Sequence, residues 1–258
     1  MSTPRASFSS QWEQAARLGH RRATMTVAVI IPTLNEDSVI ERTLQLTRPL
    51  GFEEIIVVDG GSTDRTNVIV DTIAGSAIAG STPIRRFTAP PGRSTQLNAG
   101  ARACRQDVLL FLHADSHLPG DAKRLIEFAM ADPGVAGGRF DLRFDRPSMW
   151  GRIISRLMNL RSRLSRISTG DQAMFVRRHV FQQINGFPEI PLMEDIEFSA
   201  RLKRTGRTVA LRSVVTTSFR RWERRGPLRT IFLMWALRFL YWIGISPHRL
   251  ARLYADVR

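Results

Sequence analysis

The chain of 258 residues is 43% hydrophobic, which suits one large globular domain or one domain with a small addition. Its 38 Lys and Arg residues exceed its 23 Asp and Glu residues, and the formal net charge of +15 favours anionic partners such as nucleotides, nucleic acids or lipid headgroups. The single cysteine, Cys104, excludes an intramolecular disulfide framework and a cysteine-rich zinc site.

The first half of the chain alternates between strand-like and helix-like stretches. Residues 1–24 are polar and lack an apolar run, so we expect a flexible tail and not a signal peptide. Apolar, β-branched runs predict buried strands at Val27–Ile31, Ile55–Val58, Ile84–Phe87 and Val108–Leu112. Helices are predicted between them at Glu36–Thr47, Asp64–Ile73 and Arg93–Cys104. This order predicts a doubly wound, largely parallel α/β sheet flanked by helices.

The alternation loosens after Pro133, where the chain is expected to adapt to a partner. The pattern predicts strands at Val135–Phe144, Gln172–Val176, Thr208–Leu211 and Val214–Ser218. It predicts helices at Ser148–Ile167 and Met193–Arg204. We therefore expect one α/β domain over residues 25–225 and a helical extension over residues 226–258.

The extension contains the most apolar stretch of the sequence. A helix over Pro227–Trp242 would be roughly 25 Å long, whereas a bilayer core is roughly 30 Å thick. We therefore do not expect a transmembrane span. Trp235, Tyr241 and Trp242 lie among arginines, which leaves open an interfacial helix over residues 227–245. Packing on the domain or on a partner chain is the alternative.

Polar and glycine residues follow the first two predicted strands. Pro32, Thr33 and Glu36 follow the first strand and could offer a ligand backbone donors and side chains at a helix start. Asp59 and Gly61 follow the second strand, where a carboxylate could accept hydrogen bonds from a base or ribose. When each segment is taken alone, ordinary helix capping by Asn35 is favoured for the first, and simple turn chemistry could explain the second.

Three further segments carry candidate chemistry. Arg93 begins a helix and could face a diphosphate. Asp115 ends a strand and could hold Mg²⁺ or Mn²⁺, while a packed or hydrogen-bonding role is favoured for His113. Glu194 and Asp195 lie in a predicted first helical turn, where the helix dipole favours acids and keeps a general base ionised.

These five segments, taken in order, resemble glycosyltransferase family 2, which has the GT-A fold with a mixed, mostly parallel sheet. The similar stretches are Ile30–Glu36, Val57–Asp64, Gly92–Gly100, Phe111–Asp115 and the Glu194–Asp195 pair. The resemblance covers roughly residues 25 to 225. Among its subgroups, the chain most resembles the small bacterial set described as associated with radical-SAM/selenodomain proteins, a label that reports genomic neighbours and not a substrate.

The resemblance implies an inverting, metal-dependent transfer of a sugar from a UDP- or GDP-linked donor to an acceptor hydroxyl. Asp195, paired with Glu194, would be the catalytic base, and Asp115 would bind the divalent cation. Residues implied at the nucleotide sugar are Pro32, Thr33, Glu36, Asp59, Gly61, Arg93, His113, Ala114, Arg221 and Trp222. The chain departs from the family pattern at His113, where an aspartate is usual, and at Ser218–Trp222, where the Gln of processive members is absent. A single transfer is therefore expected.

Two other functions remain open at this point. A protein that binds nucleic acid or an anionic membrane through Arg220, Arg221, Arg224 and Arg225 would explain the charge, with a degenerate site. A nucleotidyltransferase would share the metal chemistry but release pyrophosphate. The glycosyltransferase interpretation is preferred, with no specific nucleic-acid partner, a lipid-linked acceptor left open, and a cytoplasmic location that allows contact with the inner face of the cell membrane.

Overall fold

The computed structural model describes residues 25–76 and 80–256, apart from the side chains of Arg221, Arg224, Arg225, Pro227, Ala255 and Asp256. The tail expected at residues 1–24 lies outside this part. One eight-stranded sheet has the order β3-β2-β1-β4-β7-β6-β8-β5. Its strands are β1 (Val27–Thr33), β2 (Glu54–Asp59), β3 (Ile84–Thr88), β4 (Val108–Phe111), β5 (Ser116–His117), β6 (Val135–Phe144), β7 (Phe175–Arg177) and β8 (Arg207–Thr217).

The first half of the sheet is parallel, as the alternating sequence pattern predicts. β1 pairs in parallel with both β2 and β4, and β2 pairs in parallel with β3. Every residue of β2 and β4 is buried, which fits strands covered on both faces. The connecting helices are α2 (Ile40–Thr47), α3 (Thr66–Gly75) and α4 (Arg93–Ala103), with a 3₁₀ turn, η1 (Arg48–Leu50), after α2. The α/β prediction is confirmed.

The second half of the sheet mixes strand directions. β7 is antiparallel to β4 and β6, whereas β6 and β8 are parallel. The two late strands predicted from sequence are one strand, β8, whose pairing with β6 shifts register between Phe140 and Asp141. This irregularity falls where the polar residues Arg212 and Ser213 interrupt the apolar pattern. The strand predicted from Gln172 begins later, because residues 170–172 form a 3₁₀ turn, η2 (Gly170–Gln172).

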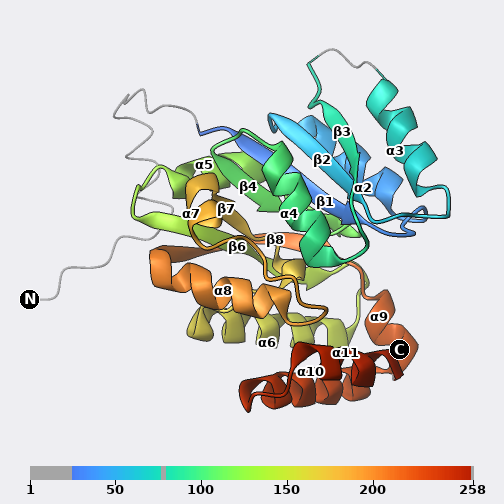
Figure 1. Ribbon diagram of the computed structural model, residues 1–258, viewed down its shortest axis with the longest axis vertical. Coiled ribbons are helices and arrows are strands. Elements are labelled where there is room, and N and C mark those ends of the chain that lie inside the picture. Colours follow the sequence, from blue (N-terminus) through green and yellow to red (C-terminus); the bar gives the residue numbers. More distant parts are fainter. Residues whose placement is uncertain (1–24, 77–79, 257–258) are drawn as a thin grey trace, which may run out of the picture.

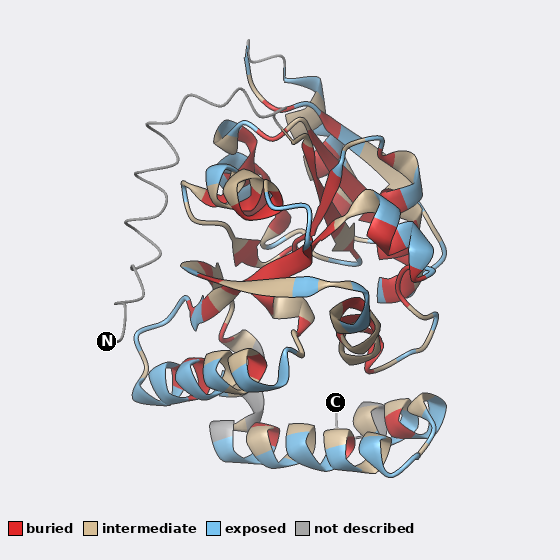
Figure 2. Ribbon diagram, turned by 90° about the vertical axis from the view of Figure 1, so that its left-hand side faces the viewer, coloured by how far each residue is buried: buried red, intermediate tan, exposed pale blue. Residues whose placement is uncertain are grey.

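Helices cover both faces of the sheet, and β1 contributes alternate residues to the two cores (Figure 2). Val27, Val29 and Ile31 pack with residues of α2, α3, α5 (Ala122–Met130) and α6 (Met149–Ser165). Ala28 and Ile30 pack with residues of α4, α7 (Arg178–Gln183) and α8 (Glu194–Thr205). The carboxyl ends of β1, β2 and β4 thus share one edge of the sheet, where open α/β sheets bind ligands.

Three helices complete the described chain: α9 (Arg220–Arg225), α10 (Pro227–Trp242) and α11 (Pro247–Asp256), drawn in red below the sheet (Figure 1). Leu237 of α10 and Leu250 of α11 form a small core with Met193, the residue that precedes α8. Tyr241 donates a hydrogen bond from its hydroxyl to Glu197 of α8 over 3.1 Å. Within residues 25–76 and 80–256, no helix is both long and apolar enough to cross a bilayer.

Candidate active site

The loops that follow β1 and β2 are tied to each other by hydrogen bonds. Asn35 has a left-handed backbone (φ 55°), and its amide donates to the Ser62 hydroxyl over 2.9 Å. The Asn35 side-chain oxygen accepts from the Thr63 amide over 2.9 Å. The Glu36 amide donates to Thr66 Oγ1 over 2.8 Å. These contacts fix the two strand ends relative to each other before any ligand binds.

A buried glutamine on α4 forms hydrogen bonds with the backbone at the ends of both β1 and β2. Gln96 is 3% exposed, and its Nε2 donates to the carbonyl oxygens of Thr33 and Val58 over 2.7 and 2.8 Å. The hydrogen bonds place the start of α4, and therefore Arg93, beside the predicted nucleotide residues Pro32 and Thr33. Sequence reasoning missed Gln96, although a polar residue on the buried face of a predicted helix was a detectable signal.

Asp59 organises its own loop. Its carboxylate is 1% exposed and accepts hydrogen bonds from the amides of Gly61 and Ser62, the Ser62 hydroxyl and the Asn67 side chain. Burial raises the pKa of Asp59, but the hydrogen bonds from Ser62, Asn67 and Gly61 outweigh it and hold the pKa below its usual range. Gly61 has a φ of +94°, which a residue with a side chain rarely adopts. Base recognition by Asp59 stays a prediction.

Glu36, Arg93, Asp115 and Arg220 form one electrostatic group at the sheet edge. Burial and the charge of Asp115 raise the pKa of Glu36, while Arg220 and Arg93 act in the opposite direction. Arg220, at the start of α9, also donates from Nη1 to the Ser38 hydroxyl over 3.3 Å. Sequence reasoning assigned this role to the neighbouring Arg221, whose side chain lies outside the described residues.

The segment His113–Asp115 follows β4. Ala114 is buried, and its carbonyl accepts from Thr43 Oγ1 over 2.6 Å, which ties this turn to α2. A Cβ added to Gly170 would lie 2.5 Å from Nε2 of His113, so the imidazole stands against the backbone of η2. This position favours the packed role of His113 over metal ligation. Within the described part of the chain, no group of three or more His, Cys, Asp or Glu residues could hold a metal.

Asp195 is held at the first turn of α8 by backbone donors. Its Oδ2 accepts from the amide of Gly170 over 3.0 Å, and its Oδ1 accepts from the amide of Ile196 over 2.7 Å. Met193, immediately before the helix, has a left-handed backbone (φ 72°) and is buried against α10 and α11. The carboxylate is therefore oriented by η2 and by the first turn of α8, and the C-terminal helices pack against the residue that precedes this turn.

Glu194 is buried beside Asp195 and close to Arg93. Burial and the charge of Asp195 raise the pKa of the Glu194 carboxyl, while Arg93 acts in the opposite direction. Arg93 Nη1 lies 3.4 Å from Glu194 Oε1. The ion pair links the predicted diphosphate residue of α4 to the predicted catalytic pair of α8, which are 101 residues apart in the chain.

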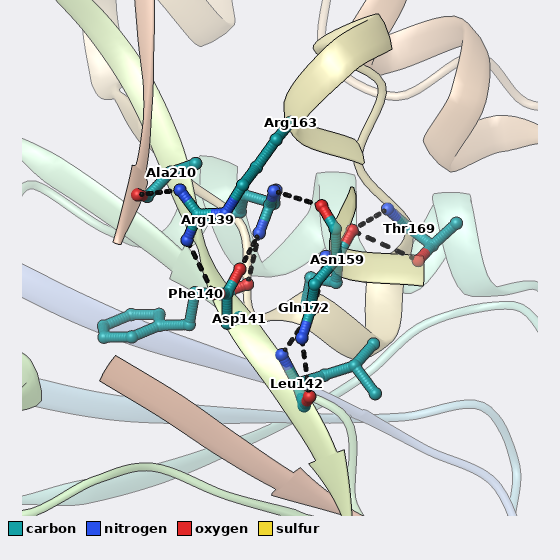
Figure 3. A network of polar contacts seen from close by, with 9 residues as sticks. All are labelled: Arg139, Phe140, Asp141, Leu142, Asn159, Arg163, Thr169, Gln172 and Ala210. Atoms are coloured by element: carbon teal, nitrogen blue, oxygen red, sulfur yellow. Dashed lines mark hydrogen bonds and ion pairs between the residues drawn. The ribbon is translucent and has the colours of Figure 1, made fainter. Parts of the chain in front are cut away.

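A polar network behind the site fixes η2, the turn that carries Gly170 (Figure 3). Asn159 of α6 makes two 2.9 Å hydrogen bonds to the backbone of Leu142 in β6. Gln172 is fully buried and donates to Asn159 over 3.5 Å, while its Oε1 accepts from the Thr169 amide over 3.1 Å. The network therefore connects β6 and α6 to the turn that orients Asp195.

A small pocket brings Arg93, His113, Glu194 and Asp195 together, while Glu36, Asp59 and Asp115 lie outside its lining. Its lining residues are Arg93, Leu97, Phe111, Leu112, His113, Gly170, Met174, Phe187, Glu194 and Asp195. Trp222, predicted to meet the acceptor, packs its ring against Phe144 and Phe219 at centroid distances of 5.8 and 6.4 Å. The Trp222 ring thus packs α9 against the core, and its contact with an acceptor stays a prediction.

Comparison with known proteins agrees with this geometry. The chain matches the model of glycosyl transferase family 2 over residues 28–184. It is 28% identical over 97 residues to glucosyl-3-phosphoglycerate synthase of Mycobacterium tuberculosis, covering 36% of this chain and 30% of that protein. It is 32% identical over 143 residues to undecaprenyl-phosphate 4-deoxy-4-formamido-L-arabinose transferase of Pseudomonas fluorescens, covering 52% and 40%. The matches thus span only about a third of the length of these curated relatives.

A solved structure shares the fold. A mannosyltransferase from Pyrobaculum calidifontis, in complex with GDP-Man and Mn²⁺, superposes with a TM-score of 0.59 at 20% identity, covering 89% of this chain and 67% of the other. The α/β architecture, with its mixed, mostly parallel sheet flanked by helices, is thus the GT-A fold. Because the family match extends over more than half of the sequence, the chain belongs to glycosyltransferase family 2.

Proposed function

We propose that this protein transfers a single sugar from a nucleoside diphosphate-sugar to an acceptor hydroxyl, with inversion at the anomeric carbon. The observation that carries the proposal is the ion pair between Arg93 and Glu194. It joins a cluster suited to a diphosphate, made of Glu36, Asp115 and two arginines, to Glu194, the neighbour of the proposed base Asp195. Such a transfer needs both parts within one site.

The donor would lie at the carboxyl ends of β1, β2 and β4. Arg93 and Arg220 would face its diphosphate and stabilise the charge that develops on the leaving group. Asp115 offers one carboxylate, which fits Mg²⁺ or Mn²⁺ because these ions commonly take one or two carboxylates together with phosphate oxygens and water. When bound, such a cation would supply further charge stabilisation to the diphosphate.

Asp195 would remove the proton from the attacking hydroxyl. Its two backbone hydrogen bonds fix the orientation of the carboxylate, which suits a group that must accept a proton from a bound hydroxyl. The hydroxyl oxygen would then attack the anomeric carbon on the face opposite the diphosphate, and the configuration would invert. Glu194 would hold Arg93 toward the diphosphate.

A lipid-linked acceptor at a membrane surface is part of the proposal. One face of α10 exposes Leu228, Phe232, Trp235, Phe239, Trp242 and Ile243, and Phe232 and Trp242 are 82% and 81% exposed. A stripe with this spacing, in a basic protein, is typical of helices that lie in the headgroup region. The P. fluorescens relative is named for an undecaprenyl-phosphate acceptor, which supports the same idea.

Product analysis tests this proposal against the other two functions. The purified chain is incubated with UDP- and GDP-sugars and Mn²⁺, and released nucleoside diphosphate and pyrophosphate are measured separately. Release of the nucleoside diphosphate is expected, whereas pyrophosphate would identify a nucleotidyltransferase. Tight, salt-sensitive binding to DNA without binding of any nucleoside diphosphate would favour the nucleic-acid function instead. The resemblance to the radical-SAM/selenodomain subgroup stays a prediction and does not identify the acceptor.

A further inference from the structure

Two arginines from helices far apart in the sequence lie together behind Asp195. Arg161 is on α6 and Arg238 is on α10, and each is only partly exposed. Burial, followed by the charge of Arg238, lowers the pKa of Arg161 to about 10, so the guanidinium stays charged at neutral pH. The charges of Asp171 and Asp195 act in the opposite direction, and that of Arg139 in the same direction. The fold therefore brings two cations together at the edge of the site.

These guanidinium groups are not satisfied within the described part of the chain. Nε and Nη2 of Arg161 and Nε of Arg238 are buried atoms without a hydrogen-bond partner there. Buried donors without partners are uncommon in folded proteins because each costs free energy. Two neighbouring like charges add a further cost. An oxyanion between the two side chains would remove both costs, since a guanidinium matches phosphate and carboxylate geometry.

The arginine pair lies apart from the donor cluster. The charges of Asp115, Arg93 and Arg220 act on Glu36, whereas the acids that act on Arg161 are Asp171 and Asp195. Asp171 and Asp195 offset part of the positive charge of Arg161, but Nε and Nη2 of Arg161 and Nε of Arg238 still lack a hydrogen-bond partner in the described chain. The arginines thus form two groups. Arg93 and Arg220 lie with the donor cluster, and Arg161 and Arg238 lie on a second side of Asp195, where an acceptor would enter.

We propose that Arg161 and Arg238 bind an anionic group, a phosphoryl or carboxylate, of the acceptor, and thereby place its hydroxyl at Asp195. This inference rests on the proposed function and assigns its acceptor class. The M. tuberculosis relative is named for a phosphoglycerate product and the P. fluorescens relative for a lipid phosphate, and the two names share this chemistry. The anion could therefore belong to a soluble phosphate ester or to a lipid phosphate beside the exposed face of α10.

Anion binding to the full chain tests the proposal. The protein is first saturated with Mg²⁺ and with UDP or GDP, whichever binds, so that the donor side is filled. Binding of labelled inorganic phosphate is then measured by equilibrium dialysis for the wild type and for Arg161→Gln/Arg238→Gln. The matched control, Arg156→Gln/Arg229→Gln, removes one exposed arginine from each of the same two helices and the same total charge.

We expect the Arg161→Gln/Arg238→Gln variant to bind phosphate at least about tenfold more weakly, because two charge-assisted contacts are lost. The control should stay within about twofold of the wild type, since screened surface charges contribute little. Nucleoside diphosphate binding should be unchanged in both, which also shows that both fold. Equal phosphate affinity in all three proteins, or no phosphate binding to the wild type, would overturn the inference. Failure of the wild type to bind either nucleotide would instead refute the proposed function.

Competition distinguishes the two sources of the anion. Glycerol 3-phosphate in solution is compared with phosphatidylcholine vesicles that contain dihexadecyl phosphate, each displacing labelled phosphate from the wild type. Displacement by glycerol 3-phosphate supports a soluble phosphorylated acceptor, and displacement only by the charged vesicles supports a lipid phosphate. Displacement by neither contradicts an acceptor of this class.

Discussion

The two sides of the candidate site differ in how completely their charged groups are satisfied. On the donor side, the loops after β1 and β2 bond to each other, and the Asp59 carboxylate accepts four hydrogen bonds from Gly61, Ser62 and Asn67. On the other side, Arg161 and Arg238 keep buried nitrogens without partners in the described chain. α10 also exposes an apolar stripe there.

This difference indicates that the donor side is organised before any ligand binds, whereas the other side is completed by what it binds. A preformed site loses little conformational freedom on binding, and its residues are held by main-chain contacts. Buried donors without partners raise the free energy of the unbound protein. Only a ligand that pairs with them removes this cost, which gives selectivity for that ligand. The predictions below test each side in turn.

The largest expected effect is on proton transfer. Asp195→Asn keeps an oxygen for the Gly170 amide but removes the base, so the rate of transfer should fall by about 10² to 10⁴. Nucleotide affinity and melting temperature should change little, which calorimetry and thermal unfolding would check. Glu189→Gln, an exposed acid before α8, is the control. Full activity of the Asp195→Asn variant would exclude Asp195 as the base.

The next effect concerns the cation on the donor side. Asp115→Asn should remove most of the benefit that Mn²⁺ brings to nucleoside diphosphate affinity, about a hundredfold or more where the metal bridges protein and diphosphate. Titrations of the variant with and without Mn²⁺ measure this benefit directly. Glu41→Gln, an exposed change on α2, should leave it intact. A variant with the metal dependence of the wild type would contradict the role of Asp115.

The packing of the C-terminal helices should affect the rate of transfer less than these two substitutions do. Leu237→Ala removes a buried side chain from the core that holds Met193, at a cost of about 2 to 5 kcal/mol. Transfer should slow as well, since Met193 directly precedes Glu194. Leu228→Ala, an exposed change on the same helix, should cost less than about 0.5 kcal/mol. Equal stability of both variants by urea unfolding would show that α10 does not support the site.

The smallest effect is a pH dependence of stability on the donor side. Because the folded pKa of Asp59 is lowered, its ionised form stabilises the fold above the unfolded pKa of about 3.9, and this stability is lost as the pH falls through the folded pKa. Asp59→Asn should therefore be less stable than the wild type at pH 7, and the difference should shrink as the pH falls below about 4. Urea unfolding between pH 3 and pH 7 measures it. A difference that does not change with pH would contradict the hydrogen-bonded carboxylate.

The donor half could be predicted from sequence because its signals are local. Apolar runs such as Val27–Ile31 specify buried strands, and in a parallel sheet the residues that follow those strands meet at one edge. This reasoning predicted that Pro32, Asp59 and Asp115, which follow such strands, share one edge. The contact of Arg220 with Ser38 could not be predicted, because it depends on where β8 ends and α9 begins.

The side of the site that carries Arg161 and Arg238 could not be predicted, because its contacts join segments that are far apart in the sequence. Arg161 and Arg238 meet only once α6 and α10 pack, and 76 residues separate them in the chain. Gln172 and Asn159 are ordinary polar residues in sequence. The apolar pattern predicted a strand from Gln172, whereas this residue ends the turn η2 and is fully buried there. The register shift that joins two predicted strands into β8 is likewise a property of the pairing with β6.

Calorimetric titration of the wild type with UDP- and GDP-sugars, in the presence of Mn²⁺ and again with excess chelator, tests the central claim most directly. We predict that one nucleotide series binds with one site per chain, and that the chelator weakens this binding. Absence of binding to every nucleotide sugar in the presence of Mn²⁺ would contradict the claim that this sheet edge is a donor site.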